Sequence, residues 1–145
     1  MTSSKSSPRS EHRIRRRVQF YETDAAGIVH FSNYYRYMED AEHELWRAAG
    51  LSIMHTAGVE FPRVAAAFDF LRPLRFEDEF EIAIRIIELR DKVIRYACVM
   101  TLGSERVAAG TMTIVCVQKT SEGLRSVAIP DQIARCFAAA ADDSR

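Results

Sequence analysis

The sequence predicts an α+β fold in which one antiparallel sheet packs against a long helix. Residues 34–49 have apolar side chains at helical spacing, whereas residues 80–89 alternate between apolar and mostly charged side chains. Two further alternating segments, 93–102 and 107–118, follow after short turns, a pattern typical of an antiparallel meander. A helix with a broad apolar face needs a partner layer to cover it, so these patterns together predict one two-layer domain.

The composition indicates one globular domain and excludes several kinds of partner. The 145 residues are 48% hydrophobic and 28% charged, which is ordinary for such a domain. Twenty basic residues balance twenty acidic ones, so we expect neither nucleic acid nor an anionic membrane as a partner. We predict a disordered, Ser-rich tail over residues 1–11, with no apolar run for a signal peptide or membrane span, and a single domain over residues 12–141.

The three cysteines, Cys98, Cys116 and Cys136, are widely spaced and form no Cys-x-x-Cys pair. We therefore expect reduced thiols in the core of a cytoplasmic protein.

The first half of the chain contains a strand followed by the long helix. Residues 13–21 alternate as a strand does, although Arg16 falls on the apolar side. For the helix over residues 34–49, Ser32 or Asn33 is a suitable N-cap, and Gly50 suits the left-handed position beyond the end.

The second half of the chain contains the remaining strands. A short helical turn is predicted over 51–57, then a strand over 59–71 in which Pro62 requires an edge position or an irregularity. In the strand after Pro73, the alternation breaks at Ile87 and Leu89, which predicts a bulge or burial on both faces.

Two tight turns, at 90–92 and 103–105, join the three strands of the meander. Pro130 is suited to the first position of a final helix that extends to about residue 141.

The segment from Phe20 to Tyr34 is the most informative for function. It places Asp24 on a short turn containing Gly27, just ahead of the long helix, where backbone N–H groups lack helical partners. An ionised carboxylate there can attack a carbonyl, or direct water at it, while backbone donors hold the developing negative charge. The alternative is an ordinary turn residue whose carboxylate bonds its own backbone.

This segment resembles the signature of the 4-hydroxybenzoyl-CoA thioesterase family of hotdog-fold proteins, which runs approximately Asp-x-x-Gly-[Val/Ile]-Val-x-x-x-x-Tyr. The matching positions are Asp24, Gly27, Ile28, Val29 and Tyr34. The resemblance implies a sheet wrapped around the helix, and an acyl-CoA thioesterase that acts as a homodimer, or as a homotetramer built from two dimers, with sites between subunits. It extends more loosely over residues 13–130.

The resemblance also implies roles for single residues. Asp24 would be the nucleophile or general base, and the backbone N–H of Phe31 would bind the oxyanion. Substrate would contact the rest of the turn and the helix start, at Gly27, Ile28, Val29, His30 and Tyr34. The basic turn with Arg90 and Lys92 would meet the phosphates of coenzyme A, although Asp91 interrupts it.

The position of His30 departs from the family pattern, because many members have an aromatic residue followed by His where this chain has His30 followed by Phe31. His30 can line the acyl pocket, orient water or simply pack with a hydrogen bond. Glu39 and Glu42 lie on the predicted helix. Glu39 is the alternative acid, because a related hotdog group uses a helical carboxylate as its base. The simpler interpretation of Glu39 is a solvated charge or one that contacts another subunit.

No other catalytic motif is present in the sequence. The segment 43–47 lacks the second His of a zinc protease helix, and neither a Gly-x-Ser-x-Gly elbow nor a phosphate-binding Gly loop occurs. We therefore predict no cofactor and no metal. Two alternatives to the thioesterase remain: a hydratase or dehydratase of acyl thioesters that uses His30 with Asp24, and a non-enzymatic acyl-CoA-binding protein.

Overall fold

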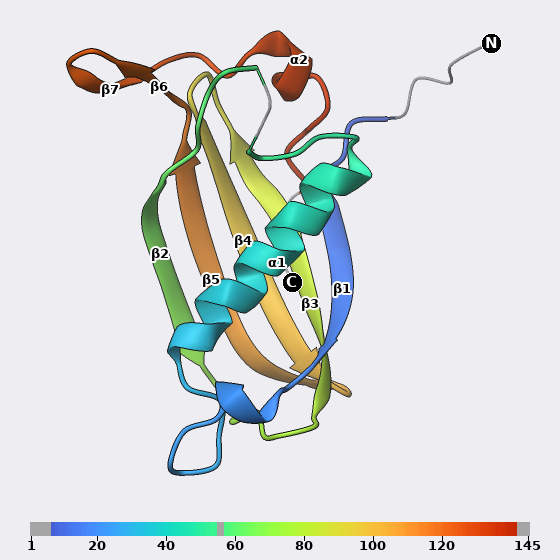
Figure 1. The fold of residues 1–145 in the computed structure, drawn as a ribbon. Coiled ribbons are helices and arrows are strands. Elements are labelled where there is room, and N and C mark those ends of the chain that lie inside the picture. The colour runs from blue at the N-terminus through green and yellow to red at the C-terminus, as the bar shows by residue number, and fades with distance from the viewer. Residues whose placement is uncertain (1–6, 55–56, 142–145) are drawn as a thin grey trace.

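An antiparallel sheet of five strands forms one layer of the protein, and a long helix crosses one face of it (Figure 1). The computed structural model describes residues 7–54 and 57–141. The strand order is β1-β3-β4-β5-β2, so the meander lies at the centre and β1 and β2 form the edges. The strands are β1 (Glu11–Arg17), β2 (Arg63–Phe70), β3 (Glu79–Leu89), β4 (Val93–Leu102) and β5 (Glu105–Val115).

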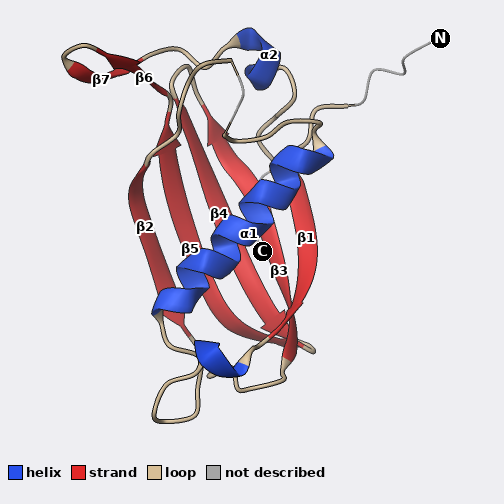
Figure 2. Cartoon of the chain, in the orientation of Figure 1, coloured by secondary structure: helices blue, strands red, loops and turns tan. Residues whose placement is uncertain are grey.

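The remaining elements are a long helix across the face of the sheet and shorter elements at its two ends (Figure 2). They are the helices α1 (Ser32–Ala48) and α2 (Asp131–Ala134), the 3-10 turn η1 (Phe20–Glu22) and a hairpin of β6 (Val117–Thr120) and β7 (Gly123–Ser126). The predicted α+β class and the three-strand meander are confirmed.

The core lies between α1 and the central strands. The helix buries Tyr37, Leu45 and Trp46 completely, and the indole Nε1 of Trp46 donates to the hydroxyl of Tyr96 on β4 at 3.0 Å. Each such buried side chain contributes roughly 1.5–3 kcal/mol to folding. The alternating residues of β3 and β4 that are buried in the same core include Ile82, Ile84, Ile86, Ile94, Tyr96, Cys98 and Met100.

The start of α1 differs from the prediction. Neither Ser32 nor Asn33 is the N-cap; Phe31 occupies that position without a side-chain cap. The ring of His30 takes over the capping role, since its Nδ1 atom accepts from the Ser32 N–H at 3.3 Å. At the other end, Gly50 has a φ of 81°, as predicted for the residue beyond the helix.

Several strand boundaries also differ. The first strand ends at Arg17 because the chain turns into η1, and the predicted strand over 59–71 is shortened to β2. Pro62 lies just before this edge strand, and the pairing of β2 with β5 is irregular between Arg63 and Ala65. The predicted bulge is confirmed, because the register of β3 against β4 shifts between Ile86 and Glu88.

Two other predicted segments also differ from the structure. In the described part of 51–57 no helix forms, while His55 and Thr56 lie outside the described residues. The predicted strand over 107–118 divides into β5, which ends at Val115, and β6.

The predicted C-terminal helix to residue 141 was wrong beyond Ala134. After α2 the chain pairs with its own beginning and with β3 instead. The Ala138 N–H donates to Arg9 O at 3.0 Å, and the Ala140 N–H donates to Ile86 O at 2.7 Å. The last residues of the predicted tail are therefore ordered: Arg9 is hydrogen-bonded to the C-terminal segment, and β1 begins at Glu11. For residues 1–6, which lie outside the described residues, the tail remains a prediction.

Candidate functional site

The turn after η1 folds around Asp24. Its backbone N–H donates to Ile28 O at 2.8 Å, and its carbonyl accepts from the Gly27 N–H at 2.9 Å. The Oδ1 atom accepts from the Ala26 N–H at 2.8 Å, with a longer contact of 3.4 Å to the Ile28 N–H. The carboxylate is exposed, and within the described residues its hydrogen bonds all go to Oδ1. Asp24 thus shapes its own turn while Oδ2 stays available for chemistry.

Gly27 supplies the backbone angle that closes this turn. Its φ is 81°, in the region that side chains with a Cβ rarely adopt, and no heavy atom lies within 4 Å of the place a Cβ would take. The glycine is therefore explained by backbone geometry rather than by crowding.

The first turn of α1 leaves one backbone donor without a partner. The Asn33 N–H donates to His30 O at 2.9 Å, and the Tyr34 N–H donates to Phe31 O at 3.2 Å. The Ser32 N–H is bonded to the ring of His30. Among the described residues, the Phe31 N–H donates to no group of the protein. It is the donor at the helix start that a bound oxygen can use.

The ring of His30 is held against the helix. Its Nδ1 lies 2.8 Å from Ser32 Oγ and accepts from the Ser32 N–H, which places the imidazole proton of the neutral ring on Nε2. The ring also stacks on Phe31, with centroids 4.7 Å apart. The ring of His30 is therefore hydrogen-bonded although the residue is exposed, and a role toward substrate or water stays a prediction.

An open cleft of about 630 Å³ lies beside the turn. Of the predicted site residues, Asp24, Ile28, Val29, Phe31 and Tyr34 line it, whereas Gly27 and His30 lie in the adjacent turn. Tyr34 is buried against the sheet, and this desolvation raises the pKa of its hydroxyl. The cleft therefore has one carboxylate and one free N–H on a mainly apolar wall.

The opposite wall comes from the loop after β2 and was not predicted. Val29 donates to Leu74 O at 2.8 Å, and Ile28 pairs with Arg75 in an antiparallel bridge, so this loop is tied to the turn. The sequence pattern does not predict this contact, because the turn and the loop after β2 are distant in sequence. The wall residues are Phe70, Leu71, Arg72, Pro73 and Arg75.

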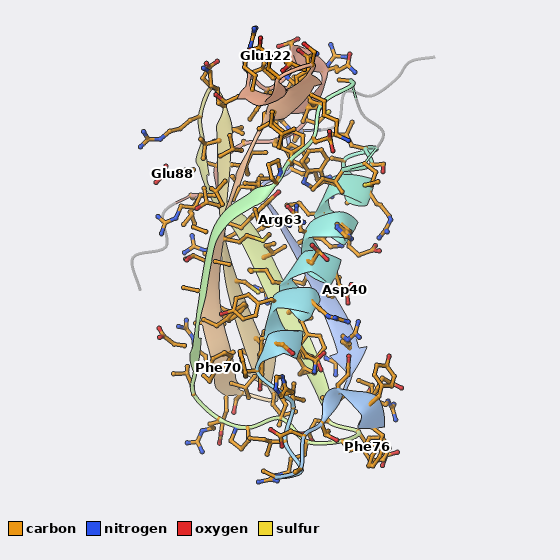
Figure 3. All side chains as sticks on the ribbon, turned by 60° about the vertical axis from the view of Figure 1, so that its left-hand side comes forward. Asp40, Arg63, Phe70, Phe76, Glu88 and Glu122 are labelled. Carbon is orange, nitrogen blue, oxygen red and sulfur yellow. The ribbon has the colours of Figure 1, made fainter. Side chains whose placement is uncertain are left out.

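Arg90 and Lys92 are not brought to this cleft. They flank the turn between β3 and β4, at the end of the sheet near α2, whereas α1 begins at the other end (Figure 1). The view of Figure 3 shows Phe70 and Phe76 at the end where α1 begins, with Glu88 toward the opposite one. The cations that line the cleft are Arg72 and Arg75 instead.

Behind the turn lies a partly buried cluster formed by Arg16, Glu22, Tyr37 and Asp40. Glu22 is 3% exposed, and its Oε2 accepts from Arg16 at 2.7 Å, while Oε1 accepts from the Tyr37 hydroxyl at 2.9 Å. Arg16 also pairs with Asp40 and lies over the ring of Tyr37, with its Cζ 4.9 Å from the centroid. Arg16 lies on the apolar side of its strand, where the ion pairs and the ring of Tyr37 stabilise its guanidinium group.

A second buried carboxylate, Glu42, lies between α1 and β2. It is fully buried and forms an ion pair with Arg63, which also contacts Glu39 at 3.1 Å; Figure 3 shows Arg63 between the edge strand and the helix. Desolvation raises the pKa of Glu42 to about 7, although Arg63 opposes the shift. Neither glutamate lines the cleft, so the ion pairs attach the helix to the sheet edge.

The cysteines are free, as predicted, and burial raises the pKa of the Cys98 thiol to about 12. Within residues 7–54 and 57–141, no cluster of His, Cys, Asp and Glu has the arrangement of a metal site. In the same part of the chain no helix has the length and hydrophobicity needed to cross a bilayer.

Comparison with known proteins supplies relatives for this fold and site. The model of a family described as the Thioesterase-like superfamily matches residues 18–137. A 1,4-dihydroxy-2-naphthoyl-CoA hydrolase of Nostoc punctiforme is 29% identical over 121 residues, covering 81% of this chain and 80% of that protein. An Aquifex aeolicus protein named "Putative esterase" is 48% identical over 77 residues, which are 52% of this chain. Those residues span 60% of the Aquifex protein, less than two thirds of its length.

The fold has a close match among solved structures. The 4-hydroxybenzoyl CoA thioesterase from Pseudomonas sp. strain CBS-3 superimposes with a TM-score of 0.77, covering 86% of this chain and 96% of that one. At 23% identity this likeness shows the fold alone. It confirms the predicted hotdog arrangement of a sheet wrapped around a long helix.

Proposed function

The chain belongs to the Thioesterase-like superfamily, and we propose that it is a thioester hydrolase, namely an acyl-CoA thioesterase with its site in the cleft beside Asp24. The observation that carries this proposal is the pairing of two groups on one cleft: a carboxylate with a free oxygen, and an unbonded N–H at a helix start. Thioester hydrolysis needs an oxygen nucleophile and an oxyanion donor, and these two groups supply them.

In the proposed reaction, Asp24 Oδ2 attacks the thioester carbonyl or takes a proton from the water that attacks it. The carbonyl π electrons move onto oxygen, and the Phe31 N–H donates a hydrogen bond to this oxyanion. When the carbonyl re-forms, the carbon–sulfur bond breaks and coenzyme A leaves as a thiolate that is then protonated. In the nucleophile route, water hydrolyses the resulting anhydride. The products are a carboxylic acid and free coenzyme A.

The acyl group is proposed to lie on the apolar walls of the cleft. Gly27 and His30 shape the turn on one side, and Ile28, Val29 and Tyr34 face the substrate. Tyr34 and Phe70 both line the cleft and pack edge-to-face against each other, with ring centroids 5.0 Å apart. An aromatic pair of this kind suits a flat acyl group. Because relatives are named for 1,4-dihydroxy-2-naphthoyl-CoA, aromatic acyl groups come first among candidate substrates.

The protein is further proposed to work as a homodimer, or a tetramer of two dimers, in the cytoplasm. The edge strand β2 is largely exposed and reads Arg-Val-Ala-Ala-Ala-Phe-Asp-Phe, with Val64 59% exposed. An apolar edge with unpaired backbone groups is a template for pairing with a second sheet. Arg90 and Lys92 lie far from the cleft of their own chain, so a role at the coenzyme A phosphates requires them to come from a neighbouring subunit.

A thiol-release assay over a panel of acyl-CoA esters tests the proposal. The panel contains aromatic, medium-chain, short-chain and enoyl acyl groups, and free thiol is measured by a colorimetric reagent. We expect release with at least one aromatic acyl-CoA. Loss of enoyl-thioester absorbance without thiol release would indicate a hydratase instead, and stoichiometric binding without either reaction would indicate a binding protein.

A further inference from the structure

We propose that Glu22 is a positioning residue that sets the geometry of both proposed catalytic groups, an inference that rests on the function proposed above. Glu22 is not part of the family signature quoted for this turn and does not line the cleft. It is one of two charged residues that are almost fully buried among the described residues, the other being Glu42.

The carboxylate of Glu22 is anchored by three donors from three directions. Oε2 accepts from Arg16 on β1 at 2.7 Å, and Oε1 accepts from the Tyr37 hydroxyl of α1 at 2.9 Å. The third donor is the Gln19 N–H, at 2.8 Å from Oε1. A buried carboxylate held in this way has little freedom to move, because losing any one bond leaves a polar group unpaired.

The backbone carbonyl of Glu22 connects this anchored residue to the start of α1 through two hydrogen bonds. It accepts from the His30 N–H at 2.9 Å and from the Asn33 Nδ2 at 2.9 Å. The peptide that follows His30 contains the Phe31 N–H, so the direction of that N–H depends on the bond to Glu22. On the other side, Thr23 alone separates Glu22 from Asp24. One anchored residue therefore fixes the carboxylate and the oxyanion donor relative to each other.

Such a residue should affect the rate of reaction more than the binding of substrate. A displacement of about 1 Å in a catalytic group can cost on the order of 100-fold in rate. The acyl pocket is formed by other residues, so KM should change little. A group that acts only on the transition state lowers kcat and kcat/KM together.

The test compares Glu22→Gln with Asp40→Asn. The glutamine keeps an acceptor for Tyr37 but turns an NH2 group toward Arg16, which breaks the anchor. Asp40 is the other carboxylate paired with Arg16 and is not hydrogen-bonded to the turn, so Asp40→Asn is the matched control. We expect Glu22→Gln to lower kcat about 10-fold or more with KM within about twofold, and Asp40→Asn to leave both nearly unchanged.

Hydrogen exchange of the His30 amide, measured by NMR, gives a readout that does not depend on activity. We expect exchange to be faster in Glu22→Gln and unchanged in Asp40→Asn. Binding stoichiometry of a non-hydrolysable thioether analogue of an acyl-CoA reports the folded fraction. If Glu22→Gln does not fold, Tyr37→Phe removes one anchoring bond and should show the same two effects more weakly.

The possible outcomes separate this inference from the proposed function. Unchanged kcat and unchanged His30 exchange in a folded Glu22→Gln protein would overturn the inference. A fall in kcat that matches a fall in analogue stoichiometry would also overturn it, since the role would then be structural. Faster His30 exchange in a protein whose wild type releases no thiol would support the anchoring and refute the thioesterase proposal.

Discussion

The Oδ1 atom of Asp24 accepts a hydrogen bond from the Ala26 N–H at 2.8 Å, within the same turn. The second oxygen of the carboxylate has no hydrogen-bond partner among the described residues, and the residue is exposed and lines the cleft. One side chain thus serves both as a turn former and as a reactive group. The two interpretations of Asp24 that the sequence left open are therefore compatible.

Replacing Asp24 with Asn should abolish most thiol release while preserving the turn. The asparagine Oδ1 can still accept from the Ala26 N–H, but the side chain is no longer a nucleophile or base. We expect kcat to fall by about 10²–10⁴-fold. Steady-state kinetics with the best acyl-CoA of the panel measure this, and thermal unfolding should change little. Asp91→Asn, at the far turn, is the control, and an Asp24→Asn enzyme of wild-type rate would refute the assignment.

Replacing Phe31 with Pro should remove the oxyanion donor. The φ of Phe31 is −55°, close to the angle that proline requires, so the helix start can accept the ring. Loss of one such donor costs about 2.7–4 kcal/mol of transition-state stabilisation, or 10²–10³ in kcat. Phe31→Ala is the matched control because it keeps the N–H while removing the aromatic ring. Equal kcat values for the two variants would argue against the backbone donor.

The stability of the protein should fall as the pH rises from about 4.5 to about 7. Burial raises the pKa of Glu42 from its ordinary value of 4.5 to about 7, so the folded state binds a proton that the unfolded state releases in this range. Stabilisation from the protonated form is complete below about pH 4.5 and is lost as the pH passes 7. The change amounts to roughly 3 kcal/mol.

Chemical denaturation at a series of pH values measures this dependence. In Glu42→Gln the side chain does not titrate, so the slope between pH 5 and 7 should be smaller than in the wild type. Glu39→Gln is the control, because Glu39 contacts the same Arg63 but is 45% exposed. A slope in Glu42→Gln as steep as that of the wild type would show that other groups cause it.

The arginines on the unpredicted wall should contribute to coenzyme A binding. Within the described part of the chain the side chain of Arg72 pairs only with the exposed Glu105, at 2.8 Å, and both Arg72 and Arg75 line the cleft. For the double variant Arg72→Gln/Arg75→Gln we expect KM for acyl-CoA to rise about 10-fold, as a charge-assisted hydrogen bond to phosphate is worth about 1.5–3 kcal/mol.

Two comparisons make this prediction specific. The KM for the matching N-acetylcysteamine thioester, which has no phosphates, should stay unchanged in the same variant. The double variant Arg90→Gln/Lys92→Gln removes the other two cations that are candidates for binding the phosphates. If only that pair raises KM for acyl-CoA, the phosphates are bound by a neighbouring subunit and the role of Arg72 and Arg75 is refuted.

Local pattern was sufficient for much of the fold. The long helix, the meander and the bulge near Ile87 follow from the spacing of apolar residues, because burial of one face dictates periods of 3.6 and 2. The turn with Asp24 and Gly27 could also be predicted, since a carboxylate and a glycine at that spacing are typical of a tight turn or a functional site.

Contacts between distant segments decided the rest. The final helix stops at Ala134 because its continuation pairs with Arg9 and β3, and the cap of α1 is the ring of His30 rather than Ser32 or Asn33. The second wall of the cleft and the anchoring of Glu22 by Arg16 likewise join segments that no local pattern relates. Local pattern was thus enough to name the candidate residues of the proposed site. Their surroundings could not be predicted in the same way, because burial and hydrogen bonding across the fold are non-local.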